Sequence, residues 1–144
     1  MRFASLLCCL VLATPAAAWD FSPLPICTMS RQSDGAETIV TYDPAIQEYA
    51  IHITLDGAIW PPSDVFAIRF EGGRGLTIST GRHVIDEGGA RLTVRDRGFG
   101  NVLAGLEANA VAIAVLGDRA ITVPLDGAAE AVADFRACGV LPLT

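Results

Sequence analysis

Apolar and polar residues alternate along several short segments of this chain, and a period of two is typical of half-buried β-strands. The clearest alternation covers residues 49–55, and a second covers residues 66–70. Other segments of strand length are residues 37–42, 76–80, 84–85, 91–95, 110–116 and 120–123. Turn residues separate these segments, and residues 86–89 and 117–118 each predict a hairpin. The pattern therefore predicts a mainly β fold of about seven short strands.

Two segments predict accessory helices. Asn101 is expected to cap a short internal helix, and Asp126 is expected to cap a C-terminal helix over residues 127–137. Residues 19–31 are rich in proline and are interpreted as an irregular arm. Short strands without a βαβ pattern favour an antiparallel β-sandwich or a small barrel, so the expected fold class is mainly β within α+β.

Residues 1–18 have the composition of a secretory signal peptide. A positive start precedes an apolar stretch over residues 3–13, which is followed by the small-residue cleavage pattern Ala16–Ala18. We therefore expect cleavage before Trp19 and export to the periplasm or the cell exterior. Residues 19–144 are expected to form one domain, and no later segment is long and apolar enough to predict a transmembrane helix.

The predicted export decides how the cysteines are interpreted, because the compartment outside the cytosol is oxidising. Cys8 and Cys9 leave with the predicted leader, so Cys27 and Cys138 remain. A single pair in an oxidising environment predicts a disulfide that joins the two ends of the domain. Closing so long a loop stabilises a fold by roughly 4–5 kcal/mol on the chain-entropy model. A reactive thiol or a metal site is the alternative, although neither cysteine has a CxxC partner or a nearby histidine.

The charge and the missing lysine exclude several classes of function. Loss of Arg2 with the leader changes the net charge from −6 to −7, because 9 Arg then face 16 acidic residues. A net negative protein is a poor candidate for binding nucleic acid. The chain contains no lysine, which excludes a Walker A loop and Schiff-base chemistry. We expect no cofactor and no metal, because only two histidines are present.

Arginines supply the best candidate for an interaction surface. Arg91 and Arg95 share one face of a predicted strand, and together with Arg69 and Arg82 they form a candidate anion-binding patch. The alternative is a set of ordinary surface ion pairs. Trp60 begins a stiff loop with two prolines and is a second candidate contact.

His83 and His52 are the most plausible candidates for a catalytic base, and paired carboxylates are an alternative. A hydrolytic triad needs a serine, a histidine and an aspartate that lie close together in space. Ser79, His83 and Asp86 lie close together in sequence and are one candidate set. Neighbours on one strand seldom converge, and no nucleophile-elbow motif is present. His52 is expected on the face of its strand opposite the core.

One resemblance extends over nearly the whole predicted mature chain. It rests on Trp19–Phe21, Cys27, and residues 66–70, 76–80, 96–103, 125–128 and 135–138. These segments resemble small secreted proteins of alphaproteobacteria with no established activity. Some proteins of this group carry the label of a helicase-like component of an excision-repair nuclease (excinuclease), a label that the predicted export, the net charge and the missing P-loop do not support.

Three functions follow as hypotheses. The first is a non-enzymatic exported binding or interaction module of unknown ligand or protein partner. The second is a small hydrolase that acts on envelope material with His83 or His52 as its base. The third is a secreted inhibitor of another protein that presents the loop beginning at Trp60.

Overall fold

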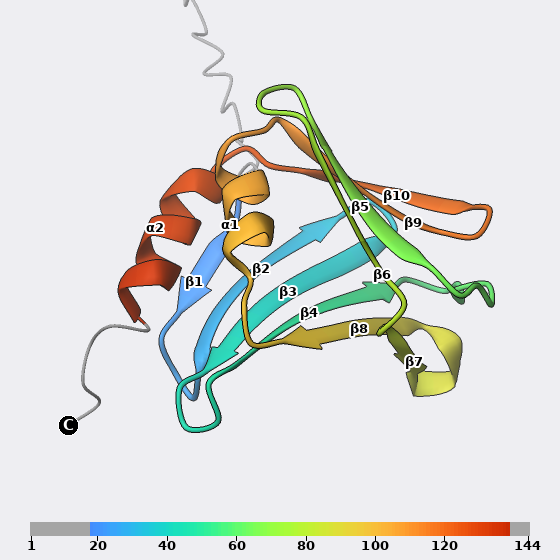
Figure 1. Cartoon of the computed structure of the whole chain (residues 1–144), viewed down its shortest axis with the longest axis horizontal. Helices are drawn as coiled ribbons and strands as arrows, with labels where there is room; N and C mark the ends of the chain where they lie inside the picture. Colours follow the sequence, from blue (N-terminus) through green and yellow to red (C-terminus); the bar gives the residue numbers. More distant parts are fainter. Residues whose placement is uncertain (1–17, 139–144) are drawn as a thin grey trace, which may run out of the picture.

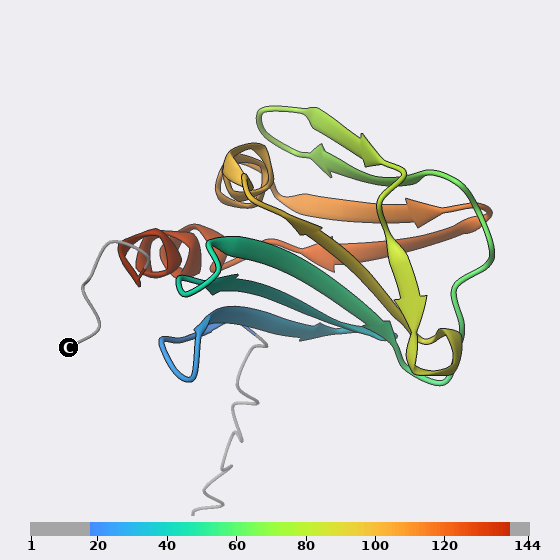
Figure 2. The same cartoon turned by 60° about the horizontal axis from the view of Figure 1, so that its bottom comes forward.

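The computed structural model describes residues 18–138, which fold into ten strands, two α-helices and one short 3-10 turn (Figure 1). The strands form two separate antiparallel sheets, seen as two layers in Figure 2. The predicted mainly β fold is confirmed, and it is a sandwich rather than a closed barrel. None of the helices in this part of the chain has the length and apolar character needed to span a bilayer.

The larger sheet has six strands in the order β1-β2-β3-β4-β8-β7. Their bounds are β1 Asp20–Ser22, β2 Cys27–Ser33, β3 Ala36–Asp43, β4 Glu48–Leu55, β8 Arg91–Asp96 and β7 Val84–Asp86. The 3-10 turn Glu87–Gly89 joins β7 to β8, so the predicted hairpin at residues 86–89 is confirmed.

The smaller sheet has four strands in the order β10-β9-β5-β6. Their bounds are β5 Phe66–Glu71, β6 Leu76–Thr80, β9 Val111–Leu116 and β10 Arg119–Pro124. Because β6 and β10 are its two edge strands, the sandwich has two open sides. One side lies between β6 and β8, and the other lies between β10 and β2.

Strand alternation places the core between the sheets. In β4, Ile51, Ile53 and Leu55 are buried while His52 and Thr54 lie on the outer face, as the sequence pattern predicted. The smaller sheet faces them with its own alternating set. The fully buried large side chains come from both sheets and from the last helix: Phe70, Phe135, Met29, Ile53, Leu92, Leu116, Val40 and Val132.

Two helices pack together at one end of the sandwich (Figure 1). They are α1 Gly100–Glu107 and α2 Ala128–Cys138. The expected capping role of Asn101 is wrong, since Phe99 precedes the first helical residue and no side chain caps α1. The helix therefore begins at Gly100, two residues before the start that a cap at Asn101 would give.

The predicted disulfide between Cys27 and Cys138 is confirmed, with an S–S distance of 2.02 Å. It joins the first residue of β2 to the last residue of α2. The interpretation of residues 19–31 as an irregular arm is wrong, because these residues include β1 and most of β2. The predicted leader lies almost entirely outside the described residues, as does Gly139.

Candidate functional site

A cavity of about 450 Å³ lies on the open side of the sandwich between β6 and β8. Its volume falls in the range of pockets that hold small molecules, about 300–1,000 Å³. The wall is built from both sheets and the start of α1: Ile51, Phe66, Ile68, Ile78, Ser79, Thr80, Arg82, Val94, Asp96, Gly98, Phe99, Gly100, Asn101 and Val102.

Aliphatic and aromatic side chains form the floor of the cavity. Phe66 and Ile68 point inward from β5, and Ile78 is the register partner of Ile68 on β6. Ile51 and Val94 face them as register partners from β4 and β8. Phe66 and Ile68 belong to the buried core, so the cavity is continuous with the hydrophobic interior. An apolar occupant would therefore lose its contact with water on this surface.

An ion pair between Arg82 and Asp96 lies at the rim of the cavity. Arg82 Nη2 donates to Asp96 Oδ2 over 3.0 Å, and the backbone N–H of Arg97 donates to the other carboxylate oxygen over 2.7 Å. Both oxygens of Asp96 are therefore bonded, while the guanidinium keeps unused donors. The side chain of Arg82 is 72% exposed and can reorient toward a bound anion.

The first turn of α1 supplies further donors to the rim. The N–H of Leu103 is the first to bond within the helix, reaching the carbonyl of Phe99 over 2.8 Å. The N–H groups of Gly100, Asn101 and Val102 precede it and have no intrahelical acceptor. These residues line the cavity, so the first turn of α1 adds backbone donors to its rim beside Arg82.

Phe99 holds this turn in place. Its ring is buried and stacks on Tyr49 with the ring centroids 5.4 Å apart. Burial, with a smaller effect from nearby Tyr42, raises the pKa of the Tyr49 hydroxyl above its ordinary value. The aromatic stack links α1 to the large sheet, so the donors at the start of α1 keep a fixed position.

The structure separates the four arginines of the predicted patch, and Arg82 lies at the cavity rim. Arg91 and Arg95 lie on the outer face of the large sheet, whereas Arg69 lies on the outer face of the small sheet. Each makes an ion pair, with N–O distances of 3.2 Å for Arg91–Glu87, 3.4 Å for Arg95–Glu48 and 2.6 Å for Arg69–Glu71. The predicted patch is therefore not one continuous surface.

His52 lies between Arg91 and Arg95 on the outer face of the large sheet. Its Nδ1 is 2.9 Å from Thr93 Oγ1. Burial lowers the pKa of His52 below its ordinary value, and the two arginines lower it further against weaker opposing effects of Asp86 and Glu87. The imidazole is therefore neutral near pH 7.

The triad residues do not form a hydrogen-bonded set within residues 18–138. His83 Nε2 lies 3.0 Å from the carbonyl oxygen of Ser63, and its Nδ1 is buried without a partner in the described chain. Ser79 lines the cavity, while Asp86 pairs in register with Arg91 on the other sheet. No group of three histidine, cysteine or acidic side chains in the described residues could hold a metal ion.

Trp60 is buried rather than presented to a partner. Its side chain is 3% exposed, and its Nε1 donates to the carbonyl of Ile53 over 3.1 Å. Its neighbour Ile59 is 61% exposed and carries the accessible apolar surface of this loop. The indole therefore supports the fold, and any contact made by this loop comes from Ile59 and the residues that follow Trp60.

The cavity was missed at the level of sequence because its wall comes from five separate segments. The one available signal is the Gly98–Phe99–Gly100 string, because glycines on both sides of an aromatic residue indicate a chain reversal. Comparisons with protein-family models, with curated proteins and with solved structures found no match to this chain.

Proposed function

We propose that this protein is an exported binding module that holds a small molecule with an apolar body and one anionic group. The observation that supports it is the cavity between β6 and β8, which joins an apolar floor to a donor-bearing rim. The apolar body packs on Phe66, Ile68 and Ile78. The anionic group lies at the rim, where Arg82 and the first N–H groups of α1 are its donors.

The disulfide supports the export part of the proposal. A disulfide persists in an oxidising compartment and is rare in the cytosol. The cleavage pattern before Trp19 leads to the same compartment. Edman sequencing of protein purified from the native source should therefore begin at Trp19, and a chain that retains its initiator methionine would contradict export.

A pair of fluorescent probes tests the cavity. N-phenyl-1-naphthylamine and 8-anilinonaphthalene-1-sulfonate share one aromatic body, and only the second carries an anionic sulfonate. We expect saturable 1:1 binding of both, with the sulfonate about tenfold tighter, which corresponds to about 1.4 kcal/mol. Arg82→Gln should remove the preference for the sulfonate and leave the binding of the neutral probe unchanged.

A matched pair of variants locates the probes. Ile78→Trp fills the cavity and should abolish binding, whereas Ile113→Trp makes the same change on the outer face of the small sheet and should leave it intact. Near-UV circular dichroism of each variant confirms native packing, because partly folded states also bind the sulfonate probe. Equal binding by both variants would contradict the proposal.

The hydrolase and inhibitor hypotheses stay predictions. His83 and His52 each lack a hydrogen-bonded carboxylate within the described chain, so no observation favours the hydrolase. The inhibitor hypothesis was based on the rigid loop that begins at Trp60, and the indole of that residue is buried. The binding module therefore rests on the best-defined geometry.

A further inference from the structure

The second open side of the sandwich contains a buried arginine beside a free strand edge. A groove of about 670 Å³ runs between the end of β2 and the edge strand β10. We propose that this groove binds an extended peptide segment, which adds as a strand to β10 and places a carboxylate on Arg31. The lining residues are Arg31, Gln32, Ser33, Asp34, Ala120, Ile121, Thr122 and Pro124.

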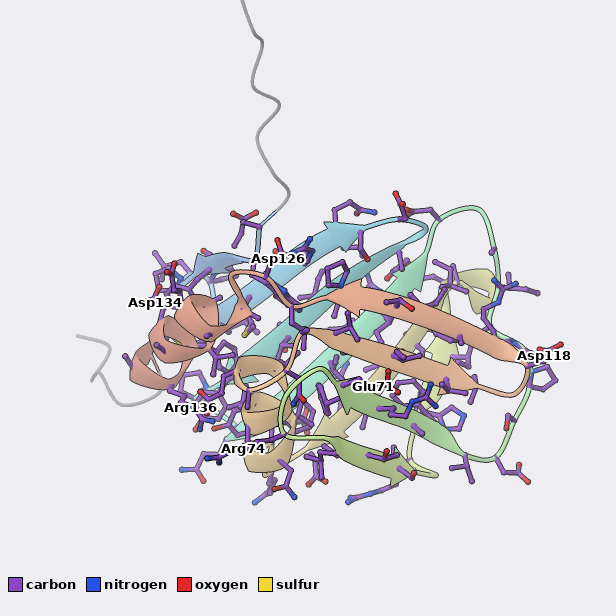
Figure 3. The ribbon with its side chains drawn as sticks, turned by 90° about the horizontal axis from the view of Figure 1, so that it is seen from above. Glu71, Arg74, Asp118, Asp126, Asp134 and Arg136 are labelled. Carbon is purple, nitrogen blue, oxygen red and sulfur yellow. A yellow bond between two sulfur atoms is a disulfide. The ribbon has the colours of Figure 1, made fainter. Side chains whose placement is uncertain are left out.

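Arg31 is a buried cation with only one side of its guanidinium in use. The residue is 7% exposed because it occupies an inward position of β2. Its Nη1 donates to the backbone carbonyl of Asp126 over 3.1 Å and forms an ion pair with Asp126 Oδ1 at 2.9 Å. Asp126 lies at the junction of β10 and α2 (Figure 3).

The other edge of the Arg31 guanidinium has no partner within residues 18–138. Nε is buried without an acceptor, and Nη2 makes no protein hydrogen bond there. A buried donor without a partner is unfavourable, because it has lost its hydrogen bond to water. Nε and Nη2 together form the planar fork that binds a carboxylate through two parallel hydrogen bonds. Nε itself is enclosed by the protein, so a carboxylate in the groove bonds Nη2 first and completes the fork when the guanidinium turns toward the groove.

The backbone of β10 supplies the second half of the site. The N–H of Leu125 bonds the carbonyl of Ala110 directly opposite it, which fixes the alternation of hydrogen bonds along the β9–β10 pair. It follows that the N–H and C=O groups of Ala120 and Thr122 point away from β9. Both residues are exposed, and β10 has no second neighbour among the described strands. An added strand can satisfy these four backbone groups.

Two features set the position of the peptide. The carbonyl of Pro124 already accepts from Trp19 Nε1 over 3.1 Å, and a proline has no N–H, so pairing ends before this residue. Asp34 is exposed at the other end of the groove, where it repels an acidic residue. The carboxylate therefore belongs at the Arg31 end, and Ile121 offers an apolar contact between the two ends.

This site is independent of the cavity described above. β10 and β6 are opposite edges of the small sheet, and the two sites share no lining residue. Binding in the groove can therefore fail while the naphthyl probes still bind in the cavity, and the reverse is also possible. The two proposals are tested separately on the same purified protein.

Two pentapeptides, acetylated and amidated at their ends, test the groove on the wild-type protein. Their sequences are TVEVT and TVQVT, so they differ by one carboxylate. Titration into isotopically labelled protein should show binding of TVEVT at least about tenfold tighter than TVQVT. It should shift the amide signals of Ala120 and Thr122 and slow their hydrogen exchange. Sodium acetate at the same concentration supplies the carboxylate alone and should bind far more weakly.

Two variants separate the charge from the strand pairing. Arg31→Lys keeps the positive charge but removes the planar fork, so it should abolish the preference for TVEVT. Thr122→Pro removes one outward N–H without touching the ladder to β9, and it should weaken both peptides. Arg82→Gln changes the cavity rim and should leave both affinities unchanged.

Several results would overturn the proposal. They are equal affinity of the two peptides, signal changes that lie away from the groove, or no binding of either peptide at about 1 mM. Acetate that binds as tightly as TVEVT would refute the strand addition. If Arg31→Lys does not fold, the comparison of the two peptides on the wild-type protein still decides the outcome.

Discussion

Gly105 is the point at which α1 approaches the small sheet most closely. It is buried on the inner side of α1 and faces the ring of Phe70. A Cβ atom at this position would lie 2.5 Å from the Cδ2 and Cε2 atoms of that ring. Phe70 is 1% exposed, and the internal cavity that it lines measures only about 10 Å³, too small for the ring to move into. We therefore expect Gly105→Ala to destabilise the fold.

The size of this effect follows from two opposing contributions. Replacing glycine by alanine inside a helix stabilises it by about 1 kcal/mol. Inserting a methyl group into a packed core costs about 1–3 kcal/mol, and a contact as short as this one favours the upper part of that range. We expect Gly105→Ala to lower the free energy of unfolding by about 1–2 kcal/mol.

Urea unfolding, monitored by the fluorescence of buried Trp19 and Trp60, measures the change. A loss of this size lowers the midpoint by about 1 M at unchanged slope. Gly100→Ala is the matched control, because its Cβ would meet no atom within 4 Å and its stability should be equal to or above that of the wild type. If Gly105→Ala proved as stable as this control, the close packing of α1 on Phe70 would be refuted.

Three further predictions concern the disulfide, a histidine and a buried indole. Replacing Cys27 and Cys138 together by alanine opens a loop with a sequence separation of 111 and should cost about 4–5 kcal/mol of unfolding free energy in urea titrations. The pKa of His52 is lowered in the folded state, so the unfolded state binds the proton more readily, and stability should decrease as pH falls below the ordinary value of 6.5. His52→Asn should flatten the dependence of the unfolding free energy on pH between about 5 and 7. An unchanged slope in this variant would contradict the assignment to His52. Trp60→Phe removes the hydrogen bond to the carbonyl of Ile53 and should lower the unfolding free energy by about 1–3 kcal/mol, whereas a neutral result would show that water replaces the donor.

The alternation of apolar and polar residues with a period of two was sufficient to predict most strands. β4 and β5 alternate apolar and polar residues without interruption, and both are confirmed close to their predicted bounds. The predicted disulfide required only the position of the two cysteines relative to the leader. The buried residues Val132 and Phe135 of α2 have the three-residue spacing that indicates one face of a helix.

β2 was missed because one inward position carries a charge. Cys27, Met29 and Arg31 alternate inward, and the arginine breaks the apolar pattern by which the strand would have been recognised. An ion pair with Asp126 makes this burial tolerable, and that residue is 95 positions away in the sequence. A contact of such long range cannot be found from local spacing.

The cavity and the separation of the arginines could not be predicted for a related reason. The side of a strand that faces the core follows from alternation, but the sheet to which the strand belongs does not. Arg69 and Arg91 were grouped because both alternate with apolar residues, and the strand order then placed them on opposite outer faces. The β6–β8 opening likewise depends on the order of strands in both sheets.

The continuity of the cavity with the core has a practical consequence. A molecule that packs on Phe66 and Ile68 becomes, in effect, part of the hydrophobic interior, so its binding and the folding of the chain are thermodynamically linked. At a concentration of about one hundred times its dissociation constant, it would add about 2.7 kcal/mol to the free energy of unfolding. A melting-temperature screen of purified metabolites can therefore find the natural occupant before its chemical identity is known.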